Sequence, residues 1–160
     1  MRRWWDDGVR TPYPDAVLER YRAAMRGELP TYRYMAYVEG AHAGMFQHYR
    51  IADWPEYEGA LALNEDAIGA DLFIGEPELI GHGHGPEMLR MFLGVAFPFY
   101  WKLGIAIKTC VIGPSVNNTS AIRACEKAGF RFVRAVSVPG EPDLEHLMRL
   151  TSDQLGPFAG

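Results

Sequence analysis

Cysteine is scarce in this sequence, and the charges nearly balance. The 160 residues include two cysteines and carry a formal net charge of −4. Cys110 lies in a β-branched run and Cys125 in an expected helix. We expect both thiols to be reduced and buried, which favours a cytoplasmic location over a secreted, disulfide-linked fold. The small acidic excess argues against nucleic acid as the main partner and is compatible with a small cationic ligand.

Long apolar runs and signal sequences are also missing. No stretch approaches the roughly 20 residues that a membrane span needs, and the basic start MRRWWDD lacks the apolar segment of a signal peptide. The sequence has no internal repeat, low-complexity tract or linker. We therefore expect residues 1–160 to form a single globular domain with no membrane partner.

The pattern of apolar residues predicts alternating blocks of strands and helices. Helical spacing follows Thr11 or Asp15, strand patterns lie on either side of Gly40, and residues 52–66 are expected to form an irregular acidic surface loop. The elements expected downstream are a strand at 72–74, a helix from 87, a strand at 105–113, a helix at 117–129, and strands at 130–138 and 143–150. This order predicts an α/β (α+β) fold, with a mixed sheet and helices on its faces.

A glycine-rich loop joins the strand at 72–74 to the helix that follows. Gly81, Gly83 and Gly85 alternate there with two histidines. Glycines accept positive φ and let a ligand approach closely, and backbone amides at the start of a helix bind anions, so the loop is a candidate phosphate site. It lacks the Lys-Ser or Lys-Thr of a nucleoside triphosphate loop and the G-x-G-x-x-G spacing of a dinucleotide turn. A simple tight connection remains the alternative.

The residues around this loop are expected to support the helix rather than to bind metal. Pro86 falls in the first helical turn, where proline is tolerated, and Met88, Phe92 and Val95 are spaced to form one apolar face. His82 and His84 form an H-x-H pair, but no further ligands stand at a recognised spacing, so no metal is expected.

Two motifs that occur in the right order resemble the GNAT superfamily of acyl-CoA-dependent N-acyltransferases. One is the strand with its glycine loop. The other is Asn118-x-x-Ala121-x-x-x-Cys125-Glu126-Lys127-x-Gly129-Phe130. With Trp4-Trp5 and Gly69-x-Asp71, they make the chain similar to aminoglycoside 6'-N-acetyltransferases and to the acyltransferases of hydroxamate siderophore synthesis. The resemblance extends over roughly residues 4 to 150.

The resemblance implies acetyl-CoA as the cofactor, held in a gap between two diverging strands. Pantetheine would pair with the backbone of Leu72, Phe73 and Ile74. The pyrophosphate would lie on the backbone amides of Ile80, Gly81, His82, Gly83, His84 and Gly85. Asn118 would contact the pantetheine arm, because a neutral amide can both donate and accept. A helix N-cap is an equally good interpretation of Asn118.

The sequence departs from the family pattern at three positions. Ile80 stands where relatives carry Gln or Arg, so the phosphate site must rely on backbone amides. Gly113 stands where many relatives carry an acidic residue before the proline, so a base often assigned there is absent. Cys125 replaces the tyrosine that commonly protonates the departing thiolate. A thiol can serve in principle, but a buried helical cysteine is more often inert packing.

Asp71 is the remaining candidate for the acid–base residue. It matches an acidic residue of the aminoglycoside branch that contacts or orients the amine, so we assign it as amine anchor and base, acting directly or through water. The alternative is a solvent-facing residue at the start of the strand. Trp4, Trp5, Trp54 and Tyr57 are candidates to line an amine-binding cleft by stacking or cation–π contact, with core packing as the alternative. The resemblance implies that Glu141 and Asp143 face the substrate, with a solvated turn as the alternative.

The resulting hypothesis is an acetyl-CoA-dependent N-acetyltransferase that acts on a primary amine of a small cationic substrate, with an aminoglycoside 6'-amine as one candidate. Gly69 and Ala70 would leave space for that substrate beside the strand. A siderophore-precursor N-acyltransferase and a non-catalytic acyl-CoA-binding protein are the alternatives. We expect a GNAT-like mixed, mostly antiparallel sheet that lacks the family's first strand and helix, in a monomer or a homodimer.

Overall fold

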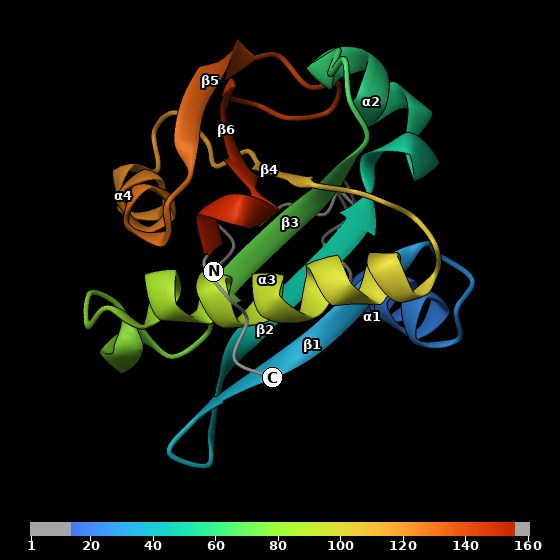
Figure 1. The fold of residues 1–160 in the computed structure, drawn as a ribbon. Helices are drawn as coiled ribbons and strands as arrows, with labels where there is room; N and C mark the ends of the chain where they lie inside the picture. The colour runs from blue at the N-terminus through green and yellow to red at the C-terminus, as the bar shows by residue number, and fades with distance from the viewer. Residues whose placement is uncertain (1–13, 156–160) are drawn as a thin grey trace.

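The computed structural model describes residues 14–155, which are organised around a six-stranded sheet (Figure 1). The strands are β1 (Thr31–Val38), β2 (Ala41–Arg50), β3 (Ala67–Ile74), β4 (Thr109–Ile112), β5 (Arg131–Val136) and β6 (Glu145–Thr151). Their order across the sheet is β1-β2-β3-β4-β6-β5, and every neighbouring pair is antiparallel except β3 and β4. The predicted mixed, mostly antiparallel sheet is therefore confirmed.

The first two strands form the hairpin that their alternating sequence predicts. A tight turn at residues 39–40 joins β1 to β2, and β2 then pairs with β3 in an antiparallel ladder. In this ladder Asp71 lies opposite Gln47, and Gly69 lies opposite Tyr49. The register therefore brings polar side chains of β2 beside the central part of β3.

In the described part of the chain, four α-helices accompany the sheet. They are α1 (Pro14–Met25), α2 (Pro55–Leu61), α3 (His84–Lys102) and α4 (Thr119–Ala128). The long helix α3 crosses one face of the sheet (Figure 1), and its Leu93 and Phe97 are fully buried in the main core with Cys110 of β4. A smaller core on the other face joins Leu61 of α2 to Val111. Neighbouring strand residues point to opposite faces, which explains why Cys110 and Val111 belong to different cores.

The structure differs from the sequence-based expectations in two elements and in the buried face of α3. Residues 52–66 are not irregular throughout, because α2 begins at Pro55, a proline in the first helical turn. The strand expected at 105–113 is shorter, since only β4 pairs with its neighbours. Val95 is 45% exposed. The buried face of α3 follows the spacing of Leu89, Leu93 and Phe97 instead, so Val95 lies on the outer side.

β3 and β4 pair over a short distance and then diverge. Their parallel ladder joins Ala67–Gly69 to Thr109–Val111. β3 continues to Ile74, whereas β4 ends at Ile112. Beyond Gly69, β3 has no strand partner on its β4 side among the described residues. This open edge presents backbone donors and acceptors to an extended ligand.

Both cysteines are free thiols buried in the core, as the sequence predicts: Cys110 is 0% exposed and Cys125 is 3% exposed. Among residues 14–155, no helix combines the length and the apolarity needed to cross a membrane.

Candidate active site

Two of the three loop glycines have the backbone conformation for which glycine is suited. After the 3₁₀ turn Pro77–Leu79, Gly81 and Gly83 have φ of 87° and 89°, and Gly83 is the N-cap of α3. Gly85 lies inside α3, where an added Cβ would be 3.5 Å from the Cβ of Ala124. Gly85 is thus buried where α3 packs against Ala124 of α4, a position that the alternating pattern does not reveal.

The loop before α3 offers backbone donors to an anion. The amides of Gly81, His82 and Gly83 donate to no backbone carbonyl in the described part of the chain, and the helix adds its positive N-terminal end. Ile80 is 56% exposed and brings no charge, so an anion here would be held by backbone groups. His82 is exposed and His84 is half-buried. Over residues 14–155, no group of three His, Cys, Asp or Glu side chains is arranged to hold a metal ion.

Leu72, Phe73 and Ile74 form the unpaired end of β3, which leads into the glycine loop. All three are half-buried. Their other edge is fixed by β2, where Gly44 lies so close that an added Cβ would be 3.1 Å from the Cα of Ile74. The strand is thus held firmly on the β2 side while its β4 side stays open.

Asp71 lies within β3 rather than before it, and its carboxylate is hydrogen-bonded. The Nε2 of Gln47 donates to Oδ2 of Asp71 at 2.7 Å, and the Nε of Arg33 donates to Oε1 of Gln47 at 2.9 Å. The Tyr49 hydroxyl is a further partner of Asp71. Burial raises the pKa of Asp71 above its usual range, although these hydrogen bonds and the charge of Arg33 oppose the shift. A raised pKa makes the carboxylate a better proton acceptor.

Two tyrosines connect Asp71 to a second carboxylate. Tyr49 hydrogen-bonds with Asp71 and with Tyr57, and the Tyr57 hydroxyl donates to Oε2 of Glu145 at 2.9 Å. Burial raises the pKa of both tyrosines well above the usual range. We call these four residues the carboxylate–tyrosine chain. Its members come from β3, β2, α2 and β6, so it connects opposite sides of the gap between β3 and β4.

Sequence reasoning misses Glu145. Burial raises its pKa to about 7, and the charges of Asp71 and Glu141 add to the shift, while the hydrogen bond from Tyr57 opposes it. Glu145 stands at the start of a strand beside an acidic turn, so no local pattern distinguishes it from a surface residue. Its contact with Tyr57 joins positions 88 residues apart, and only the fold reveals it.

Asn118 and Cys125 have clear structural roles. Asn118 is the N-cap of α4, and its Oδ1 accepts a hydrogen bond from the amide of Ala121 at 3.2 Å. The capping alternative is therefore confirmed, and it leaves the amide nitrogen of Asn118 as a donor. Cys125 belongs to the main core, and burial raises its pKa to about 12. This thiol is neutral and serves as packing in the described structure.

The small residues before Asp71 do not leave space for a substrate. An added Cβ on Gly69 would be 2.7 Å from Cζ of Tyr49, so the tyrosine ring fills that side of the strand. Ala70 is buried in the main core. The prediction of open space beside Gly69 and Ala70 is therefore wrong, because β2 and α3 occupy it.

The expected substrate-binding residues are only partly covered by the structure. Trp4 and Trp5 lie outside the described residues. Glu141 and Asp143 are exposed on the turn before β6, where Asp143 accepts a hydrogen bond from the Ser115 hydroxyl at 3.0 Å. Trp54 contacts the carboxylate–tyrosine chain, with its ring centroid 6.1 Å from that of Tyr49.

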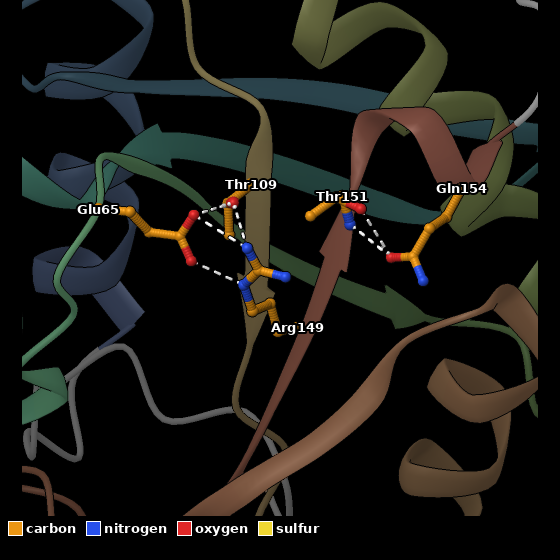
Figure 2. A network of polar contacts seen from close by, with 5 residues as sticks. All are labelled: Glu65, Thr109, Arg149, Thr151 and Gln154. Atoms are coloured by element: carbon orange, nitrogen blue, oxygen red, sulfur yellow. Dashed lines mark hydrogen bonds and ion pairs between the residues drawn. The ribbon is translucent and has the colours of Figure 1, made fainter.

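The acidic residues before β3 are engaged in ion pairs. Figure 2 shows Glu65 bridging Arg149, at 2.7 Å, and Thr109, at 2.5 Å. Asp66 pairs with Arg50 at 2.7 Å. Because arginines already neutralise these carboxylates, they fix the paired ends of β3, β4 and β6 and leave Asp71 as the carboxylate at the open edge.

The fold, with its open strand edge beside a glycine loop, is that of an acyltransferase domain. Comparison with known protein families gives the same assignment. The model of the acetyltransferase (GNAT) domain matches residues 1–138. The chain belongs to this family, which confirms the resemblance drawn from the two motifs. A search of the curated proteins gives no match.

Solved structures share this fold. AAC(6')-Ib in complex with ribostamycin and coenzyme A aligns with a TM-score of 0.78 and 23% identity over 99% of this chain and 84% of that chain. The aminoglycoside N(6')acetyltransferase from Legionella pneumophila subsp. pneumophila str. Philadelphia 1 aligns with a TM-score of 0.66 and 20% identity. The alignment covers 92% of this chain and 84% of that chain. Spermidine N-acetyltransferase from Vibrio cholerae, in complex with CoA and spermine, aligns with a TM-score of 0.64 and 15% identity. The alignment covers 91% of this chain and 80% of that chain.

Proposed function

We propose that this protein transfers the acetyl group of acetyl-CoA to a primary amine of a small cationic substrate. The observation that carries the proposal is the open edge of β3, which joins a half-buried carboxylate, Asp71, to a glycine loop at the start of α3. A thioester bound along this edge would then lie beside a proton acceptor, with its pyrophosphate at the loop.

The cofactor would extend along β3 into the loop. Pantetheine would form hydrogen bonds with the open backbone edge of Leu72–Ile74, as a strand would. The pyrophosphate would lie on the amides of residues 81–83, where positive-φ glycines keep side chains away from it. Asn118 would donate its amide N–H to the pantetheine arm while its Oδ1 caps α4.

The chemistry would depend on positioning and on one proton acceptor. The amine nitrogen attacks the carbonyl carbon of the thioester, a new C–N bond forms, and the C–S bond breaks. The substrate ammonium loses two protons in the overall reaction, one of which goes to the coenzyme A thiolate and one to water. Asp71 would accept a proton from the amine, and its raised pKa suits this role.

An aminoglycoside is the first substrate class to test. Structural neighbours are described as complexes with kanamycin or ribostamycin, and another as a complex with spermine. These ligands are all polycationic amines, which suits an acidic site with aromatic walls from Tyr49, Tyr57 and Trp54.

Thiol release tests the proposed function directly. Purified protein with acetyl-CoA should release free thiol when kanamycin, ribostamycin or spermidine is added, with formation of the N-acetylated amine checked by mass spectrometry. Thiol release at the background rate with every amine, together with tight binding of coenzyme A, would favour a non-catalytic acyl-CoA-binding protein.

A further inference from the structure

Glu145 occupies the volume that a side chain at position 113 would take. Gly113 follows β4, and a Cβ added there would be 2.7 Å from Cδ of Glu145. The side chain of Glu145, on β6, therefore lies over the backbone at the end of β4. Its position depends on the absence of a side chain at residue 113.

This position faces Asp71 across the gap. The parallel ladder of β3 and β4 ends at Gly69 and Val111, and Asp71 and Gly113 each follow two residues later, where the two strands diverge. The carboxylate over Gly113 and the carboxylate of Asp71 are close enough for the charge of one to raise the pKa of the other. The two tyrosines of the carboxylate–tyrosine chain connect them on one side.

Neither carboxylate forms an ion pair with any cationic side chain that the structure describes. The ion pairs found use other acidic residues. Arg33 acts on Asp71 through its charge and through its hydrogen bond to Gln47. The hydrogen bonds from Tyr57 and Gln47 stabilise the carboxylates but do not neutralise them. Two partly desolvated carboxylates in this arrangement are stabilised by a cation placed between them.

We propose that Glu145 is the second carboxylate of the amine site: with Asp71 it holds the ammonium group of the acceptor, and it takes up a proton that the amine releases. This inference rests on the proposed function and adds a residue from β6 to it. In the balanced reaction the ammonium loses two protons, and the one that Asp71 accepts goes on to the thiolate of coenzyme A. The other goes to Glu145 and then to water, so Glu145 returns to its ionised form after each turnover.

The groups that face Glu145 set the pH range in which it can act. They are Tyr57 of α2, Asp71 of β3, Glu141 of the preceding turn and, at longer range, Tyr49 of β2. Burial and the two carboxylates raise the pKa of Glu145 to about 7. Activity should therefore increase as the pH rises through about 7, because Glu145 must be ionised to bind the ammonium and to accept its proton.

The variant Glu145→Gln tests whether the negative charge of Glu145 matters, because glutamine keeps the shape of the side chain but is neutral. We expect kcat/KM for kanamycin to fall at least tenfold at pH 8, with unchanged affinity for coenzyme A by calorimetry. The rise of kcat/KM through pH 7 should disappear or shift. Glu58→Gln, which alters an exposed carboxylate on α2, is the matched control and should retain activity and pH profile.

Relocation of the carboxylate separates chemistry from packing. In Glu145→Ala the volume beside Gly113 is vacated, so the double variant Glu145→Ala/Gly113→Asp should recover at least tenfold in kcat/KM over Glu145→Ala. The double variant Glu145→Ala/Gly113→Asn has nearly the same shape without the charge and should recover little. Equal recovery with Asp and Asn, or an unchanged activity and pH profile in Glu145→Gln, would overturn the role of Glu145 while the transferase function stands.

Binding distinguishes failure of this inference from failure of the proposed function. Kanamycin binding is measured by calorimetry in the presence of coenzyme A, which supports no turnover, and Glu145→Gln should bind at least tenfold more weakly. One outcome is that the wild type binds kanamycin, with weaker binding in Glu145→Gln, and yet acetylates no amine. In that case the proposed acetyltransferase function is wrong, while Asp71 and Glu145 are still supported as an amine-binding site. If kanamycin, ribostamycin and spermidine are neither bound nor acetylated, both proposals fail.

Discussion

Tyr49 fills the space beside Gly69. A Cβ added to Gly69 would be 2.7 Å from Cζ of Tyr49 and 2.9 Å from Cδ1 of Ile51. The missing side chain lets the Tyr49 ring lie across β3, where its hydroxyl reaches both Asp71 and Tyr57. A glycine on the central strand therefore determines where a hydroxyl of the neighbouring strand lies.

We expect Gly69→Ala to displace the Tyr49 ring and to disturb Asp71. The overpacked site should lower the free energy of unfolding by about 1–3 kcal/mol. The kcat/KM for the amine should fall more than the affinity for coenzyme A, because the β3 edge keeps its ladder with β2. Urea unfolding and steady-state kinetics measure the two effects.

Gly59→Ala on α2 is the control for this substitution. An added Cβ at Gly59 meets no atom within 4 Å, and alanine in a helix is more stable than glycine by roughly 0.5–1 kcal/mol. Gly59→Ala should therefore stabilise the protein slightly and leave activity intact. If Gly69→Ala behaved in the same way, Tyr49 would have room to move and the coupling would be absent.

The sequence predicts the order of the elements well, because most signals are local. The hairpin turn near Gly40, the Asn118 cap and the closure of α4 at Gly129 follow from capping and turn preferences. Helix α2 is the exception. It has seven residues, rich in glutamate, and its apolar face is too short to produce a clear period.

The candidate site is less predictable, because its geometry is long-range. Asp71 and the glycine loop belong to one short stretch of sequence, so a motif identifies them. Tyr57 and Glu145 become neighbours only when α2 and β6 meet at the gap between β3 and β4. No periodicity in the sequence predicts that contact, and Gly113 by itself predicts only that an acidic side chain is absent there.

Gly83→Val tests the glycine loop. Gly83 has φ of 89°, a conformation that is costly for a β-branched residue by roughly 1–2 kcal/mol, and its amide belongs to the anion site. We expect coenzyme A to bind at least tenfold more weakly to a folded variant, as measured by calorimetry. Gly27→Val introduces comparable strain at φ of 74° after α1 and should leave coenzyme A affinity unchanged. Unchanged affinity in Gly83→Val would remove the pyrophosphate from this loop.

His48 is expected to make the fold sensitive to acid. It is fully buried, with Nδ1 at 3.2 Å from the Tyr100 hydroxyl and Nε2 at 3.3 Å from the Tyr34 hydroxyl. Burial lowers its pKa from 6.5 to about 4. The unfolded chain then binds a proton that the folded chain does not, so stability is fully present above pH 6.5 and falls as the pH drops towards 4.

The size of this effect follows from the shift of the His48 pKa. At about 1.4 kcal/mol per pKa unit, the free energy of unfolding should fall by up to about 3 kcal/mol between pH 6.5 and 4. Urea unfolding over this range measures it. The slope should be reduced in His48→Gln and retained in His42→Gln, which changes an exposed histidine of the same strand. An identical slope in both variants would assign the acid sensitivity to other groups.

Asp71→Asn tests the proposed proton acceptor. Asparagine keeps the shape of the side chain and can still accept the hydrogen bond that Gln47 donates at 2.7 Å, but it has neither charge nor basicity. We expect kcat/KM for the amine to fall by about 10² or more, the usual scale for a positioned acid–base group. Coenzyme A affinity should be unchanged, because the cofactor would contact the backbone of β3 and the loop.

The control for Asp71→Asn is Asp66→Asn, one residue before the same strand. Asp66 is paired with Arg50 at 2.7 Å, and the pair is about one-third exposed, so its loss should have a small effect on stability and none on amine turnover. Kinetics and calorimetry on the same preparations separate the two carboxylates. Full activity in Asp71→Asn would exclude Asp71 as the base and leave Glu145, across the gap on β6, as the proton acceptor.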